Sequence, residues 1–339
     1  MKKGKLLLLV ACVLTFVVAV LPVISLADSN ELVVYCAIGD KEIAPLQEAC
    51  KKDTGIDLKA LAIPIGQSTT RIKAENGHPQ ADVQMGGSID YYQELIRMDL
   101  LVPYKSPNTA KVDEKSKDPQ GYWTGFYRGV LGLVVNENQF KKELPGVPYP
   151  TTWEDLLNPA YKGKIVHTNP ASSGAGLTFI GDQIFRFNRD ENKAWDFIKS
   201  YCKNVGNYQN SSLGPANIIA TGEYPIGISW TQDAMMKIDE GYPLKILVPK
   251  DTTYELSGIA ILKGCQNLKL AQKFIDWTYT VKEGTRFEAL GHRYSVVPGV
   301  APPKGMLPYN RLKLIPYDFD YISKNKDRIV KQFTDIMNK

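Results

Sequence analysis

Short apolar runs alternate with amphipathic stretches along most of the chain. Continuous apolar runs are typical of strands covered on both faces, and apolar residues every three or four positions predict helices. The expected strands are residues 32–36, 58–63, 82–85, 123–135, 164–167, 224–229, 245–249 and 257–262. The expected helices are residues 43–50, 69–75, 90–98, 151–157, a stretch from 177, then 192–203, 215–221, 234–240, 268–279 and a tail from 317. Strand-then-helix units of this length predict an α/β fold with mostly parallel sheets flanked by helices.

Residues 1–27 have the pattern of a secretory signal peptide. Lysines at 2, 3 and 5 precede an apolar run from Leu6 to Leu26, and Ser25-Leu26-Ala27 offers a small-x-small cleavage site. The alternatives are an uncleaved membrane anchor and a lipoprotein attached at Cys12. Pro22 near the end of the run favours cleavage, and the residues after Cys12 stay apolar instead of turning polar. We therefore expect an exported protein.

The charge and length of the mature chain limit the partners and the number of domains it can have. Removing the three lysines of the signal from the 41 basic residues leaves 38 against 36 acidic ones, a net charge of about +2. A nearly neutral surface argues against nucleic acid or a membrane surface as the partner. The roughly 312 remaining residues exceed what one hydrophobic core usually serves, so two domains are expected.

Four cysteines remain after cleavage, and their spacing in the sequence matches no known cysteine motif. They are Cys36, Cys50, Cys202 and Cys265. They form no CxxC pair and no Cys/His pattern typical of zinc. One or two disulfides are compatible with an oxidising compartment, although Cys36 on an apolar strand equally suits a buried thiol.

The stretch from Gly163 to Phe187 is the strongest candidate for a binding site. A β-rich run ends at Asn169-Pro170, the small residues 171–176 follow, and an apolar helical period begins at Leu177. The first amides of a helix lack internal acceptors and carry partial positive charge, so such a corner binds anions. Ser172 and Ser173 add hydroxyl donors. The alternative is an ordinary capped helix, since serine is a good N-cap.

The same arrangement of small or hydrogen-bonding residues recurs between strands and helices. It is found in Gly39-Asp40, Gly66-Gln67-Ser68, Gly86-Gly87-Ser88, Ser172-Ser173-Gly174 and Thr231-Gln232-Asp233. In open α/β sheets, ligands bind outside the carboxyl ends of the strands. Two sheets facing each other would bring all five turns to one cleft. Turn chemistry alone also selects such residues, and we expect it to account for some of the five.

Several short motifs, in order over nearly the whole mature chain, carry a family resemblance. They are Ala81-Asp82-Val83 with Gly86-Gly87, Leu101–Tyr104, Trp123-Thr124-Gly125, Thr152–Leu157, Tyr161–Ile165, Asn169–Gly174, Gly222–Ile228 and Tyr294–Pro298. The chain resembles periplasmic solute-binding proteins of ABC importers, in the branch for ferric iron, hexose phosphates and 2-aminoethylphosphonate. The resemblance implies a monomer in the periplasm that hands its solute to a permease and its ATPase.

The fold implied by the resemblance is the type II periplasmic binding fold, with two α/β lobes and a ligand cleft between them. Lobe 1 is expected to comprise residues 28–126 and 257–300, and lobe 2 residues 127–256 and 301–339. The chain should cross between the lobes near residues 126–129 and 255–258. The hinge then closes on the ligand.

The resemblance also implies which residues bind the solute. For a phosphate or phosphonate group they are Ser172, Ser173, Gly174 and Ala175, with Ser68 and Ser88 across the cleft. For the organic part they are Asp40, Tyr127, Trp230, Thr231, Gln232, Asp233 and Glu255. Hexose-phosphate binders carry histidine where this chain has Gln232. The aromatic rings of Tyr127 and Trp230 are expected to stack on a sugar face or, alternatively, to belong to the core.

Ferric iron is the alternative ligand. The ferric binders that the chain resembles use His, Glu and an adjacent Tyr pair, where this chain has Asp40, Gly87 and the stretch 229–231. A hard trivalent cation prefers several anionic oxygens, and the expected cleft offers at most Asp40, Asp233 and Glu255. We expect no resident metal or cofactor.

An enzyme is the other alternative class. Ser172 or Ser173 as nucleophile would need a base such as His167, but the chain has no GxSxG motif. We therefore expect a binding protein.

Overall fold

The computed structural model describes residues 30–338. The predicted signal peptide, residues 1–27, and the alternative lipid anchor at Cys12 lie outside the described residues. None of the helices within residues 30–338 combines the length and apolar character needed to cross a membrane.

Strands and helices alternate as predicted, and the α/β class is confirmed. The strands are β1 (Glu31–Ala37), β2 (Asp57–Ala62), β3 (Val83–Ser88), β4 (Leu101–Val102), β5 (Thr124–Asn136), β6 (Ile165–Thr168), β7 (Val205–Gln209), β8 (Ile226–Trp230), β9 (Leu244–Leu247), β10 (Tyr254–Leu262) and β11 (Tyr294–Ser295). The helices are α1 (Asp40–Thr54), α2 (Ile65–Glu75), α3 (Ile89–Arg97), α4 (Glu137–Glu143), α5 (Gly174–Arg186), α6 (Glu191–Cys202), α7 (Gly214–Ala220), α8 (Thr231–Asp239), α9 (Leu268–Thr278), α10 (Val281–Gly291) and α11 (Phe319–Met337).

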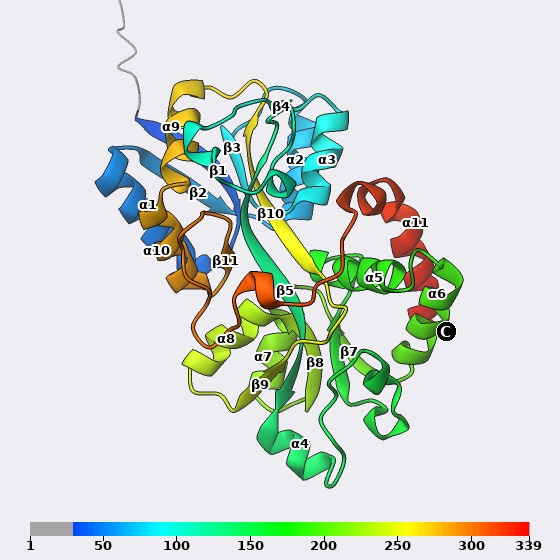
Figure 1. Cartoon of the computed structure of the whole chain (residues 1–339). Coiled ribbons are helices and arrows are strands. Elements are labelled where there is room, and N and C mark those ends of the chain that lie inside the picture. The colour runs from blue at the N-terminus through cyan, green and yellow to red at the C-terminus, as the bar shows by residue number, and fades with distance from the viewer. Residues whose placement is uncertain (1–29, 339) are drawn as a thin grey trace, which may run out of the picture.

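The sheet follows the order β2-β1-β3-β10-β5-β8-β6-β7. At both ends the strands of the βα units pair in parallel, β1 with β2 and β3, and β6 with β7 and β8. The two strands in the middle, β5 and β10, pair antiparallel, from Tyr254 opposite Val130 to Ile259 opposite Thr124. These two strands join two groups of parallel strands into one molecule, as Figure 1 shows.

Two main hydrophobic cores lie on either side of this junction. The first is built from residues between 32 and 127 and between 256 and 297, and the second from residues between 131 and 230 and between 317 and 333. We call the parts around these cores lobe 1 and lobe 2. The change of core within β5 falls between Tyr127 and Leu131. A smaller cluster, which includes Val134 and Ala234, packs α7 and α8 against the lobe 2 strands.

Beyond the shared strands, two polar side-chain contacts link the lobes along one flank. Lys41 Nζ at the start of α1 lies 2.9 Å from Glu240, just after α8. His292 Nε2, just after α10, lies 2.8 Å from Asp239. Asp239 is the last residue of α8 and Glu240 its C-cap, so both contacts hold the end of α8 against lobe 1.

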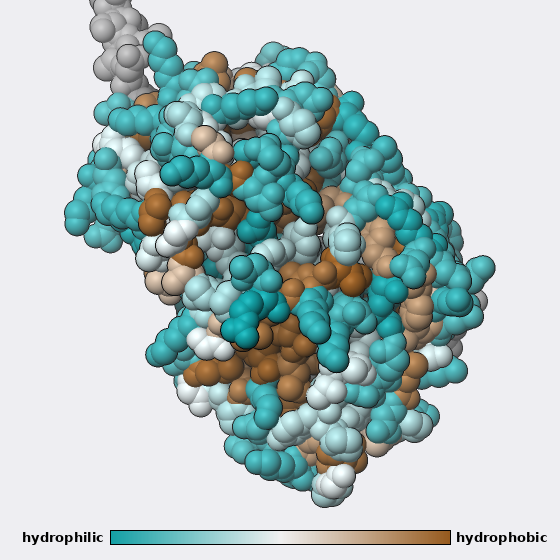
Figure 2. Space-filling view, viewed as in Figure 1, coloured by the Kyte–Doolittle hydropathy of each residue, from teal (hydrophilic) through white to brown (hydrophobic). Residues whose placement is uncertain are grey.

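The last helix makes the corresponding contact on the other flank. Helix α11 contributes Ile322 to the lobe 2 core, yet it also lies beside α3 of lobe 1 (Figure 1). Ser323 Oγ donates to the Asp90 carbonyl at 2.7 Å, and Arg97 Nη2 donates to Ser323 Oγ at 2.8 Å. Figure 2 shows this face of the molecule, where apolar residues gather in the middle of the lower lobe within a hydrophilic periphery.

The structure differs from the sequence expectation at several elements. Residues 151–157 form a 3₁₀ turn over Glu154–Leu157 instead of a helix. Helix α2 begins at Ile65 and α8 at Thr231, so two expected loops form first helical turns. The pattern did not predict α4, β7 or α10. Strand β7 is a half-buried edge strand with polar residues, and α10 carries two glycines, which weaken a helical signal.

All four cysteines of the described chain are free thiols. Cys36 is fully buried on β1, with its Sγ 4.0 Å from Met85 Sδ. Burial raises the pKa of Cys50 to about 11. The disulfides considered from the sequence are therefore not present, and the buried-thiol interpretation of Cys36 is confirmed.

Replacing Leu133 by Ala tests the importance of β5 for lobe 2. Leu133 is fully buried in the lobe 2 core. The cavity left by Leu133→Ala should lower the free energy of unfolding by about 2–5 kcal/mol, measured by chemical denaturation. Leu61→Ala on β2, where the side chain is 41% exposed, is the matched control and should change it by about 0.5 kcal/mol or less. Equal effects of the two substitutions would contradict this account of the core.

Candidate functional site

The predicted anion corner is a tight turn between β6 and α5. A Cβ at Gly176 would lie 2.6 Å from both the Pro170 nitrogen and the Thr168 carbonyl oxygen, so only glycine fits here. A Cβ at Gly174 would meet nothing within 4 Å. The backbone at the start of α5 is thus closely packed on its inner side and open on its outer side.

The serines of this corner leave the first helical amides free. Ser173 is the N-cap of α5 in extended conformation, but its side chain accepts no bond from the helix. Instead, its Oγ lies 2.7 Å from Ser212 Oγ. Ser172 is exposed, and its Oγ donates to the Asn169 carbonyl at 3.2 Å. The first amides of α5 therefore have neither a helical acceptor nor a side-chain cap, which is the arrangement expected of an anion site.

A second polar cluster lies around Gly129 of β5. Glu255 pairs with Gly129 across the β5–β10 ladder. A Cβ at Gly129 would lie 2.5 Å from Gln232 Nε2 and 2.9 Å from Glu255 Oε1, so the missing side chain leaves room for both groups. Gln232 and Asp233 occupy the first turn of α8, and all three polar side chains are buried. The structure therefore brings together Gln232, Asp233 and Glu255, as predicted from the sequence.

Two further members of this cluster were not identified from the sequence. Arg293, next to β11, pairs through Nη1 with Glu42 Oε1 of α1. Its guanidinium lies over the Tyr127 ring, 4.7 Å from the centroid. Glu42 also accepts the Gly39 amide through Oε2 at 2.8 Å, as in a capping box. Glu42 is the third residue of α1, which begins three residues before the predicted helix, and nothing local in the sequence relates it to Arg293.

Burial changes the protonation of the acidic groups in this cluster. It raises the pKa of Glu255 to about 8, against the opposing effect of Arg293. It likewise raises the pKa of Asp233 to about 6. Asp90 at the start of α3 is buried as well, and burial raises its pKa. At neutral pH, Glu255 is thus mostly protonated and can donate as well as accept a hydrogen bond.

The two predicted stacking aromatics pack elsewhere. Tyr127 is 4% exposed, and its ring contacts the guanidinium of Arg293 and the ring of Phe287. Trp230 is 3% exposed and belongs to the lobe 2 core. Of the two alternatives drawn from the sequence, these contacts agree with the core assignment of both rings. Thr231 is also buried, at the start of α8.

The remaining predicted residues differ in their availability. Ser68 lies inside α2, fully buried, and its hydroxyl donates to the Ile65 carbonyl at 3.1 Å. It therefore does not cap a helix at the cleft, contrary to its place in an expected turn. Ser88 is the buried N-cap of α3. Asp40 is exposed at the start of α1, and Ala175 is buried in α5.

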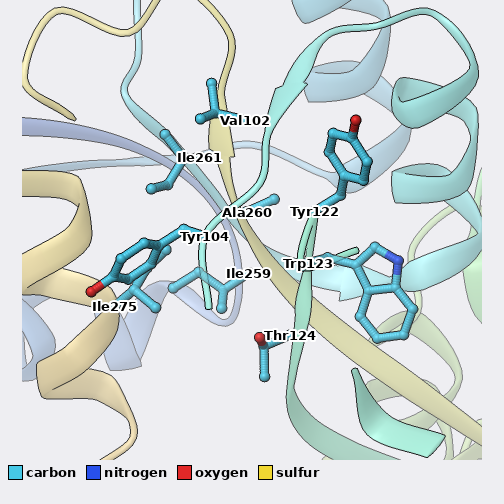
Figure 3. Close-up of a pocket in the computed structure, with 10 residues that line it drawn as sticks. Val102, Tyr104, Tyr122, Trp123, Thr124, Ile259, Ala260, Ile261 and Ile275 are labelled. Carbon is cyan, nitrogen blue, oxygen red and sulfur yellow. The ribbon is translucent and has the colours of Figure 1, made fainter. Parts of the chain in front are cut away.

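A small hollow in lobe 1 is unrelated to these residues. It is lined by residues of β4, β5, β10 and α9, such as Ile275, and by Tyr104 and Trp123 from the segment between β4 and β5 (Figure 3). Its volume of about 10 Å³ is room for about one water. None of the predicted solute-binding residues lines it, so it does not serve as the binding site.

The structure offers no catalytic pair at the anion corner. His167 is buried among the rings of Phe179, Tyr201 and Tyr208, and neither ring nitrogen has a hydrogen-bond partner. It is bonded to neither Ser172 nor Ser173, so it cannot act as their base in this arrangement. Within residues 30–338, no three His, Cys, Asp or Glu side chains are grouped to hold a metal ion.

Two α/β lobes joined by crossing strands, with helix starts and buried polar groups at the junction, define a solute receptor of the type II binding fold. Residues 78–325 match the family described as bacterial extracellular solute-binding protein, and the chain belongs to that family. It is a periplasmic solute-binding protein of the ABC-importer kind and not an enzyme.

Relatives and solved structures agree with this class. An uncharacterized protein of Haemophilus influenzae is 32% identical over 88% of each chain. A probable ABC transporter periplasmic-binding protein of Sinorhizobium fredii is 25% identical over 89% of this chain and 85% of that protein. AfuA of Actinobacillus pleuropneumoniae, solved with fructose 6-phosphate, is 30% identical with a TM-score of 0.84 over 91% of this chain and 98% of AfuA. Iron-bound HitA of Pseudomonas aeruginosa shares the fold, at 18% identity and a TM-score of 0.79 over 90% of this chain and 99% of HitA.

Acid titration of stability tests the structural role of His167. Burial lowers the pKa of His167 to about 3, below its ordinary value of 6.5. Its contribution to stability is therefore present above pH 6.5 and is lost as the pH falls toward 3, at about 1.4 kcal/mol per pH unit. His167→Phe should remove this part of the acid sensitivity between pH 6 and 4 in chemical denaturation. The exposed His78→Gln is the control and should leave the wild-type slope. Identical slopes for the His167 variant and wild type would refute the assignment.

Proposed function

We propose that this receptor captures a small organic solute bearing a phosphate or phosphonate group and delivers it to an importer permease with its ATPase. The observation that carries the proposal is the open start of α5, where the first amides have no side-chain cap and the hydroxyls of Ser173 and Ser212 lie together. An anion at this position would accept hydrogen bonds from the amides of Gly174 and Ala175 and favourable charge from the helix dipole. Export through the predicted signal peptide and a monomeric state are parts of the same proposal.

The strength of such a site suits a transport receptor. Hydrogen bonds to a charged group contribute on the order of 1.5–3 kcal/mol each. Three or four of them, less the cost of association, correspond to about micromolar affinity or better. A solute held this tightly is captured from dilute solution and can still be released.

The buried polar cluster would bind the organic part of the solute. Gln232 supplies both donors and acceptors, and Asp233 and Glu255 accept or donate according to their protonation. Hydroxyl groups of a sugar, which donate and accept, match this set. The fructose 6-phosphate in the similar AfuA structure makes hexose phosphates the first probes.

Ferric iron is the second candidate, favoured by the fold shared with iron-bound HitA. Two observations weigh against it. No metal-holding group of acidic, histidine or cysteine side chains is found among the described residues. Gly87 has φ +74°, and a Cβ there would lie 2.4 Å from Ile65, so no ligating side chain fits at that position.

Ligand-induced thermal stabilisation tests the proposal. Fructose 6-phosphate, glucose 6-phosphate or 2-aminoethylphosphonate should raise the melting temperature of the protein, because a ligand bound only to the folded state stabilises it. Ferric citrate should not. The double variant Ser172→Ala with Ser173→Ala should weaken the best organophosphate by about tenfold or more in isothermal calorimetry, since it removes charge-assisted donors.

The control for the serine variant is Ser200→Ala, an exposed serine on α6. It should leave the affinity unchanged. Stabilisation by ferric citrate alone would overturn the proposal in favour of iron. Unchanged organophosphate affinity in the double serine variant would show that neither serine hydroxyl binds the anion, contrary to this proposal.

A further inference from the structure

Arg293 has an unusual position for a charged side chain. It is 6% exposed, and among the described residues it is the one lysine or arginine that is buried. Its Nη1 pairs with Glu42, and its guanidinium lies 4.7 Å from the ring centroid of Tyr127 and 5.4 Å from that of Phe287. Its Nε is buried without a hydrogen-bond partner. A buried donor left free is costly unless something else occupies it.

The chain makes room for this pair. A Cβ at Gly291 would lie 2.0 Å from Arg293 Nη1 and 2.4 Å from Glu42 Oε1. Gly129 makes room in the same way for Gln232 of α8 and for Glu255 of the neighbouring strand, β10. Two glycines, 162 positions apart in sequence, thus accommodate one polar cluster at the junction of the lobes.

The charges around Arg293 come from four elements. Glu42 lies on α1, Asp90 on α3, Asp233 on α8 and Glu255 on β10, and all four are buried. The carboxyl group of Glu255 faces Arg293 and two acidic residues, Asp90 and Asp233. It also faces Tyr127. Asp233 faces Arg293, Glu42 and, from its own helix, Lys237. Among the described residues, Arg293 is therefore the buried basic side chain that balances four buried acidic ones.

We propose that Arg293 is a specificity-determining residue of the cleft, which allows it to accept a solute whose organic part is uncharged and hydroxyl-bearing rather than cationic. This inference rests on the proposed function.

The physical reason is charge balance at a site with little solvent. With Arg293, the acidic groups are partly neutralised, and a hydroxyl can donate to them without further charge. Without it, any of these carboxyl groups that ionises lacks a buried counter-ion, and an ammonium group on the solute would supply one. The free Nε remains as a donor for a solute oxygen. The residue thus decides between two solutes that differ only by an amine in place of a hydroxyl.

The test measures a ratio of affinities for such a pair. Glucose 6-phosphate and glucosamine 6-phosphate differ in this one group, and both are titrated by calorimetry at pH 7. Arg293→Gln should shift the ratio toward the amine by at least about tenfold, the effect expected for the loss of a buried charge. Arg293→Lys, which keeps the charge, should stay within about threefold of wild type.

The partner of Arg293 provides the reciprocal variant. Glu42→Gln keeps an oxygen for the Gly39 amide but removes a negative charge, so it should shift the ratio toward the hydroxyl solute. A general loss of structure would weaken both solutes equally and leave the ratio unchanged. If Arg293→Gln does not fold, the shifts in Glu42→Gln and Arg293→Lys decide the question.

The possible failures are separable. If wild type binds the sugar phosphates but neither Arg293→Gln nor Glu42→Gln moves the ratio, the inference is wrong and the proposed function stands. If wild type binds neither sugar phosphate, the pair 2-hydroxyethylphosphonate and 2-aminoethylphosphonate is used in the same way. If neither pair binds, both the proposed function and the inference are overturned.

Discussion

The pairing of β5 with β10 is the interaction on which the rest of the molecule depends. Each strand contributes apolar side chains to a core and backbone bonds to its partner, so the two lobes fold as parts of one sheet. The same pairing places Glu255 opposite Gly129 and thereby positions one carboxyl group of the polar cluster. A shift in the register of these two strands would displace the cluster, because register fixes which side chains share a face of the sheet. Stability and binding therefore have a common origin here.

The two parts of the candidate site follow different physical rules. The corner at Ser173 consists mainly of backbone amides, which every substitution except one by proline leaves in place and which suit any oxyanion. The cluster around Arg293 consists of side chains whose charges oppose one another inside the protein. We infer that the first part provides a general affinity for the anionic group and the second distinguishes one organic part from another. Such a division explains how one fold serves receptors for different solutes.

The sequence predicted local features well and distant ones poorly. The turn at Ser173 and the helix after it were predicted because small residues and an apolar period lie next to each other in the chain. For Tyr127 and Trp230 the sequence left a core and a cleft position open, because an aromatic at a strand end suits both and only packing decides. The pair of Arg293 and Glu42 was missed because 251 positions separate its members. Local patterns cannot reveal a contact that the topology alone creates.

The two contacts between the end of α8 and lobe 1 have a consequence for how the lobes separate. The pairs Lys41–Glu240 and His292–Asp239 join the lobes near solvent, where each ion pair contributes little and weakens as salt increases. Separating the lobes would break these weak contacts on one flank and the packing of α11 against α3 on the other. The flank at the end of α8 is the less costly of the two, so a rise in salt concentration should loosen the lobes there first.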